Sequence, residues 1–104
     1  MALILNPGVN PAKVKPEVLL ALMVVDGIYA GYDVHTVITS ISDGEHGRYS
    51  LHAFGYAVDI RTNHLPADVD KDILASQIQR RLGNMYDVVF EPNPEHIHIE
   101  YDPR

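Results

Sequence analysis

Apolar residues recur at helical spacing in two segments of the chain. Between Pro16 and Gly31 they follow one another at three- and four-residue intervals, which predicts a first helix that opens on a proline. The segment 66–82 shows the same spacing, opens on Pro66 with an acidic first turn and is followed by Gly83. We therefore expect two helices, one before and one after the middle of the chain.

Other segments alternate apolar or β-branched residues with polar ones, which is typical of a strand with one buried face. This alternation is found in 33–41, 55–60, 86–91 and 96–101. The last two segments are joined by the turn-forming sequence Pro-Asn-Pro-Glu, which predicts a terminal β-hairpin. Together with the two helices, these strands predict an α+β fold, with a small, mainly antiparallel sheet flanked by two helices.

Length and composition favour a single domain. The chain has 104 residues, 46% of them hydrophobic, which suits one compact unit with one modest core. It contains no internal repeat and no low-complexity linker. We therefore interpret residues 1–104 as one domain, in which the proline-rich stretch 1–15 forms an extended lead-in.

Charge and cysteine content limit the chemistry. Eight Lys and Arg against fourteen Asp and Glu give a net charge of -6, so the chain lacks the basic surface that nucleic acids require. No cysteine is present, which leaves His, Asp and Glu as candidate metal ligands. The longest apolar run, 18–25, is too short to span a membrane, and the N-terminus lacks the basic segment of a signal peptide. We expect a protein made in the cytoplasm, with neither nucleic acid nor membrane as partner.

Two of the predicted strands carry metal-binding residue types on their polar faces. Asp59 shares its face with small glycine and alanine residues, which leaves space beside the carboxylate. His98 shares the polar face of the last strand with His96 and Glu100. If the two strands lie side by side in one sheet, His98 comes next to Asp59. His52, in the loop that leads into the first of these strands, would supply a third ligand.

Two histidines and one carboxylate favour a catalytic rather than a structural zinc site. Three protein ligands leave a fourth tetrahedral position for water, whose pKa zinc lowers to about 7. A hydrolase also needs a group that accepts the proton of this water, and Glu95, three residues before His98, is our candidate. In a regular strand these two residues point to opposite faces, so they converge only if the chain bends at Asn93-Pro94-Glu95.

Two motifs of the chain resemble those of a known enzyme family. The stretch SLHAFGYAVD matches the SxHxxGxAxD motif of the D-Ala-D-Ala peptidases of family M15, and EHIH matches their second motif. These peptidases share one zinc superfamily with lysostaphin-type enzymes and the Hedgehog signalling domain, whose version of the first motif is also similar. The resemblance covers roughly residues 34–101 in order and spacing.

The resemblance implies a role for each matching residue. His52, Asp59 and His98 correspond to the zinc ligands, and Glu95 corresponds to the catalytic acid/base. His96 takes the position of a Trp or His that supports the site in family members, and we count it among the catalytic residues. The implied fold is that of the Hedgehog and D-Ala-D-Ala peptidase zinc proteins, with one zinc ion per chain.

The chain departs from the family at the residue that polarises the scissile carbonyl. Many members carry an Arg in a Tyr-Arg-Ser segment well before the first zinc histidine, and the corresponding segment here, TSISDGEHG, has none. Arg48 lies four residues before His52 in a glycine-flanked loop and is our candidate for binding an oxyanion or a substrate carboxylate. Ser50 and Tyr56, on either side of His52, are expected to contact the substrate.

Together with these residues, the resemblance implies a zinc metallopeptidase that cleaves a stem peptide of bacterial peptidoglycan, as a D-Ala-D-Ala carboxypeptidase or as an endopeptidase. Comparable small peptidases occur in phages, so we expect a protein that acts on the cell wall after release, as a phage product would. We also expect a monomer. Two alternatives stay open from sequence alone. One is a Hedgehog-like zinc-binding module that recognises a partner without catalysis, and the other is a structural protein without metal.

Overall fold

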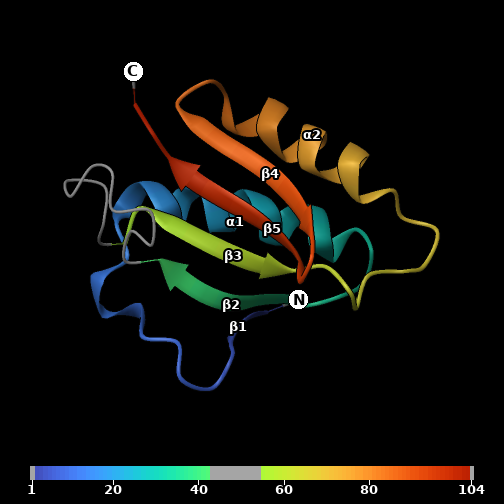
Figure 1. Cartoon of the computed structure of the whole chain (residues 1–104), viewed down its shortest axis with the longest axis horizontal. Coiled ribbons are helices and arrows are strands. Elements are labelled where there is room, and N and C mark those ends of the chain that lie inside the picture. The colour runs from blue at the N-terminus through green and yellow to red at the C-terminus, as the bar shows by residue number, and fades with distance from the viewer. Residues whose placement is uncertain (1, 43–54, 104) are drawn as a thin grey trace.

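The computed structural model describes residues 2–42 and 55–103. In chain order the elements are β1 (Leu3–Leu5), a short 3-10 turn η1 (Pro11–Lys13), α1 (Pro16–Ala30), β2 (Thr36–Ser42), β3 (Ala57–Arg61), α2 (Lys71–Leu82), β4 (Tyr86–Pro92) and β5 (Glu95–Tyr101) (Figure 1). The strands form one sheet in the order β1-β2-β3-β5-β4. β1 is parallel to β2 and the other neighbours are antiparallel, so the predicted α+β class, with a mainly antiparallel sheet and two helices, is confirmed.

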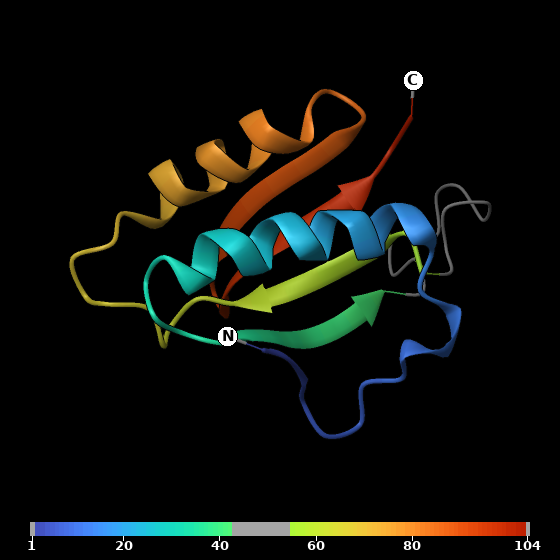
Figure 2. The same cartoon turned by 180° about the vertical axis from the view of Figure 1, so that it is seen from behind.

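Both helices pack on one face of the sheet. α1 runs behind the sheet in Figure 1 and in front of it in Figure 2, and α2 lies along β4. Val58 and Ile60 of β3, with Ile97 and Ile99 of β5, point to this face and are fully buried in the core that the helices complete. The alternate residues of the same strands therefore point to the opposite face, which neither helix covers.

The first helix is fixed to the strand that carries Asp59. Its buried residues recur at helical spacing and end at Tyr29, as the sequence predicts. The hydroxyl of Tyr29 donates a hydrogen bond to the carbonyl oxygen of Arg61, 2.8 Å away, at the end of β3. Burial, and to a smaller extent the carboxylate of Glu95, raises the pKa of the Tyr29 hydroxyl well above its usual value, so this donor keeps its proton.

The second helix begins later than its sequence predicts. It covers Lys71–Leu82 rather than 66–82. The side chain of Asp70 accepts hydrogen bonds from the backbone N–H groups of Asp72 and Ile73, at 3.0 and 3.1 Å, and so caps the helix. The proline that we expected at the first position has no side chain that can satisfy these donors, so the aspartate sets the start of the helix.

Replacing Asp70 with alanine is expected to lower the free energy of unfolding by about 0.5–2 kcal/mol, because two N–H groups in the first turn of α2 lose their acceptor. Urea unfolding followed by circular dichroism measures the change. Asp68→Ala is the matched control, since Asp68 is exposed and lies before the helix. An equal loss of stability in both variants would contradict the role of Asp70 as the cap.

The lead-in stretch 1–15 is more structured than expected. Residues Leu3–Leu5 form β1, which pairs in parallel with β2 from Leu3↔Thr36 to Leu5↔Ile38. All three side chains of β1 are exposed, so the short strand produces no alternation that sequence analysis can detect. Of the described helices, neither α1 nor α2 is long and apolar enough to cross a membrane.

Candidate functional site

The face of the sheet that the helices leave uncovered carries a cluster of ionisable side chains. Asp59 of β3 and His98 of β5 are cross-strand partners in the antiparallel register. Their side chains meet, with Asp59 Oδ1 2.7 Å from His98 Nδ1. The predicted juxtaposition of these two residues is therefore confirmed. This contact depends on the register of β3 and β5. The buried valine and isoleucines on the opposite face of the same strands fix that register.

Both ring nitrogens of His98 face carboxylates. Nδ1 contacts Asp59, and Nε2 lies 3.3 Å from Oε1 of Glu100 on the same strand. The hydrogen bond to Asp59 raises the pKa of His98 to about 9; partial burial of the ring opposes this rise, and Glu100 adds to it. In the metal-free protein at neutral pH, the ring therefore holds a proton on each nitrogen.

His96 links this pair to another carboxylate. Its Nδ1 lies 2.6 Å from the carbonyl oxygen of Pro94, which can only accept a hydrogen bond, so Nδ1 carries a proton. Its Nε2 lies 2.7 Å from Oε1 of Glu91 and 3.8 Å from Oδ1 of Asp59. This distance is that of a hydrogen bond between the imidazole and the carboxyl group. His96 and Glu91 thus form a hydrogen-bonded pair beside Asp59.

Sequence analysis did not single out Glu91. In the structure Glu91 is the cross-strand partner of His96, and Pro92 is the partner of Glu95, so only residues 93–94 form the turn. The length of the turn between β4 and β5 is the feature of the sequence that could have identified Glu91, because the size of a hairpin turn fixes which residues face one another. A two-residue turn places Glu91 opposite His96 and on the same face.

Glu95 lies on the other side of the sheet. Its Oε2 accepts a hydrogen bond from the hydroxyl of Thr62, 2.8 Å away, and lies 3.4 Å from Nζ of Lys71 at the start of α2. Thr62 is fully buried on the helix-covered face. The prolines form the hairpin turn instead of bending the strand, so β5 is regular from Glu95 onward. The convergence of Glu95 with His98 that the sequence interpretation required is not found.

The other predicted residues do not join the cluster in the described part of the chain. Tyr56 stacks on Tyr101, with ring centroids 6.0 Å apart, and the ammonium group of Lys15 lies 5.5 Å from its ring centroid. Tyr101 packs against the hydrophobic core, so Tyr56 lies on the helix side of the sheet and not beside His98. Three predicted site residues fall outside residues 2–42 and 55–103: Arg48, Ser50 and His52.

Arg61 shares the uncovered face but turns away from the cluster. It is the cross-strand partner of His96 and lies two residues after Asp59 on β3. Its Nη2 donates a hydrogen bond to Oδ1 of Asn6, 3.0 Å away, just beyond β1. The guanidinium group is therefore directed toward the β1 edge of the sheet and forms no ion pair with Asp59.

The donor atoms of Asp59 and His98 lie closer together than two ligands of one zinc ion would. Ligand bonds of about 2.0–2.1 Å at tetrahedral angles put neighbouring donor atoms roughly 3.3 Å apart. Oδ1 and Nδ1, 2.7 Å apart when a proton joins them, need only a small separation to reach this spacing. A ligating histidine usually donates its second N–H to a carboxylate, and Glu100 lies at Nε2. Among residues 2–42 and 55–103, no three His, Asp or Glu side chains are grouped to hold a metal ion.

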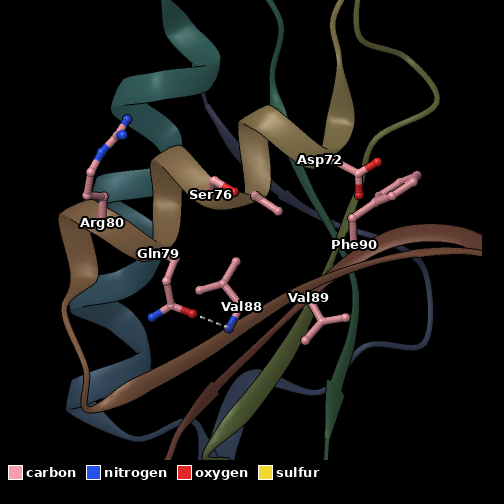
Figure 3. Close-up of a pocket in the computed structure, with 8 residues that line it drawn as sticks. Asp72, Ser76, Gln79, Arg80, Val88, Val89 and Phe90 are labelled. Carbon is pink, nitrogen blue, oxygen red and sulfur yellow. Dashed lines mark hydrogen bonds between the residues drawn. The ribbon is translucent and has the colours of Figure 1, made fainter.

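A pocket of about 440 Å³ lies elsewhere, between α2 and β4 (Figure 3). Gln79 bridges the two elements there. Its Oε1 accepts a hydrogen bond from the N–H of Val88 at 3.0 Å, and its Nε2 donates to the carbonyl oxygen of Tyr86 at 2.7 Å. The side-chain amide thus replaces a neighbouring strand at this edge of the sheet. Neither Asp59 nor His98 lines the pocket, so it is separate from the cluster.

Comparison with known proteins gives no match, whether to protein-family models, to curated proteins or to solved structures. A functional interpretation therefore depends on the residues of this chain and on their geometry.

Proposed function

We propose that the chain is a zinc-dependent peptidase with a fold of the Hedgehog and D-Ala-D-Ala peptidase type, acting on stem peptides of bacterial peptidoglycan. The observation that carries the proposal is the 2.7 Å contact between Asp59 Oδ1 and His98 Nδ1 on the uncovered face of the sheet. These two residues come from strands far apart in the sequence. They are also two of the three residues that the resemblance of SLHAFGYAVD and EHIH assigns to zinc.

The proposed ligands are His52, Asp59 and His98. A zinc ion held by such a set supplies a water of lowered pKa, about 7, and a positive charge that polarises a carbonyl group. Asp59 offers Oδ1, and His98 offers Nδ1 once the proton that the two atoms share has left. Glu100 accepts the remaining N–H of His98 at Nε2 and so holds the ring in its orientation.

Glu91 replaces Glu95 as the proposed general base. Glu91 lies on the same face as Asp59 and is joined to His96, whose Nε2 is 3.8 Å from Asp59 Oδ1. The pair can take up a proton from water at Glu91 Oε1 and return one to a departing amine, either from that oxygen or from His96 Nε2. The Glu91 side chain is 53% exposed, so a substrate can reach its carboxyl group. Glu95 is held by polar contacts on the helix side of the sheet.

The test is zinc-dependent cleavage of stem peptides of defined stereochemistry by the full chain. The purified protein is expected to bind one zinc ion, to cleave at least one such peptide, to lose this activity with a chelator and to regain it with zinc. Mass spectrometry of the products identifies the bond and separates a carboxypeptidase from an endopeptidase. Zinc binding without cleavage of any peptide would favour the Hedgehog-like module, and a chain that binds no zinc would contradict both.

A further inference from the structure

The side of α1 that faces away from the sheet is apolar. Its exposed positions, which we call the outer face of α1, are Pro16, Leu19, Leu20, Met23, Gly27 and Ala30. Leu19, Leu20 and Met23 are 47%, 60% and 67% exposed. Neither charged residue of the helix belongs to this face, and one of them, Asp26, accepts a hydrogen bond from Thr36 in the sheet. A helix that is apolar both on its sheet side and on its outer side is typical of one that is buried on both sides.

The outer face of α1 is bulky at one end and small at the other. Leu19, Leu20 and Met23 lie in the first part of the helix, whereas Gly27 and Ala30 lie in the last. A Cβ atom built on Gly27 would meet no atom within 4 Å, so the space above it is open. Such a surface is complementary to a second copy of itself turned by 180°, because the bulky half of each helix then lies over the small half of the other.

We propose that the outer face of α1 is the interface of a symmetric homodimer, in which two copies of α1 pack antiparallel around a two-fold axis near Met23. With this axis, Leu19 faces Gly27 of the second copy and Pro16 faces Ala30 of the second copy. The same patch is used on both chains, so the contact closes on itself and produces no larger assembly. This proposal differs from the monomer that we expected from the sequence.

Charges at the two ends of α1 favour the antiparallel arrangement. The exposed Asp33 follows the C-terminus of α1, whereas the ammonium group of Lys15, just before the helix, lies over the ring of Tyr56 and not on the outer face. Antiparallel packing places the two helix dipoles in their favourable orientation and brings Asp33 beside the positive N-terminal end of the other helix. The whole chain carries a net charge of -6, so two copies approach with least repulsion on a face without charged groups.

A second copy fits this face better than a lipid surface does. Helices that lie on membranes carry Lys and Arg along their polar edges, which bind anionic lipid headgroups. α1 contains neither residue between positions 16 and 30, and the acidic chain would be repelled by an anionic bilayer. Shape and charge therefore both favour a copy of this chain.

The size of the contact indicates a modest affinity. α1 has 15 residues, which corresponds to a length of about 22 Å. One helix of this length from each copy makes an interface at the small end of specific complexes, so we expect a dissociation constant in the micromolar range, about 1–100 μM. Sedimentation equilibrium of the full chain over this range should show a reversible monomer–dimer transition.

Three variants test the interface. Met23→Lys is expected to raise the dimer dissociation constant by about 100-fold or more, because each buried lysine would lie beside the same charge of the other copy. Gly27→Leu is expected to raise it by about tenfold or more, since the added bulk fills the space that the opposing leucine needs. Ile73→Lys is the matched control: Ile73 is 66% exposed and belongs to α2, not to the outer face of α1, and its change should leave the constant within about twofold.

Gly27→Leu separates specific packing from general adhesion. It makes the outer face more apolar and removes a residue that is unfavourable in helices, so a non-specific hydrophobic contact or a lipid surface would bind this variant more tightly. The proposal is overturned by tighter association of Gly27→Leu, by a wild-type chain that stays monomeric to about 1 mM, or by a monomer that binds vesicles of phosphatidylcholine and phosphatidylglycerol through this face. Circular dichroism verifies folding, and Leu20→Lys replaces Met23→Lys if the latter unfolds.

Discussion

Exchange of Glu91 for glutamine is expected to lower kcat for peptide hydrolysis by about 10²- to 10⁴-fold, with zinc content and KM nearly unchanged. Glutamine has the same shape, and its amide group can still form a hydrogen bond with His96 Nε2, which lies 2.7 Å from Glu91 Oε1 in the wild type. It cannot take up a proton, so only the acid/base step is removed. Steady-state kinetics on the cleaved stem peptide, with zinc measured on the same samples, tests this expectation.

Glu95→Gln is the matched comparison, because it makes the same chemical change on the same hairpin but on the opposite face of the sheet. It weakens a partly exposed contact with Lys71, for which we expect a loss of stability of at most about 1 kcal/mol and little change in kcat. Loss of turnover in Glu95→Gln with zinc retained, together with an active Glu91→Gln, would reverse the assignment. β5 would then have to bend at Glu95 when substrate binds.

The pairing of Asp59 with His98 could be predicted from sequence because each strand has one wholly apolar face. Val58 and Ile60 in one strand and Ile97 and Ile99 in the other must point to the core, and they are all fully buried. Alternation with a period of two then places the polar residues of both strands on the opposite face. Burial of apolar residues thus determined the face of the candidate site without any information on its chemistry.

The position of the proposed general base could not be predicted in the same way, because it depends on the turn. Two prolines in the segment 92–95 suggested a bend within the strand that would bring Glu95 toward His98. The prolines instead fall at the end of β4 and in a two-residue turn, which leaves β5 regular. Glu91, one residue before the first proline, takes the place opposite His96. Alternation alone gives the face of a residue, and only the register gives its neighbours.

The start of α2 and the first strand also could not be predicted from the pattern of apolar residues. The apolar spacing of α2 identified the helix, but its start depends on one hydrogen-bonding side chain, that of Asp70, among several aspartates of similar sequence context. The first strand, Leu3–Leu5, has no buried side chain and is fixed by backbone pairing with β2. Features that depend on backbone hydrogen bonds rather than on burial leave little trace in the sequence.

Asp59→Asn is expected to lower the affinity for zinc by more than about 100-fold, and peptide hydrolysis with it. Changing a group that only supports a ligand typically costs about 10- to 100-fold, and a charged ligand contributes more than its support. Asparagine has the size of aspartate and can still accept a hydrogen bond from His98 Nδ1, so the effect measures the lost charge and not a change in packing. Competition with a chromogenic chelator measures the affinity directly.

Two further substitutions provide reference values for the loss of zinc affinity in Asp59→Asn. Glu100→Gln should weaken zinc binding by about 10- to 100-fold, because the amide oxygen still accepts from His98 Nε2 but without its charge. Asp87→Asn is the matched control: it removes one negative charge from the same face, opposite Glu100 in the register, and should change the affinity by less than about threefold. If Asp59→Asn binds zinc as tightly as Asp87→Asn, then the Asp59–His98 pair is a hydrogen-bonded contact of the sheet and the metal lies elsewhere.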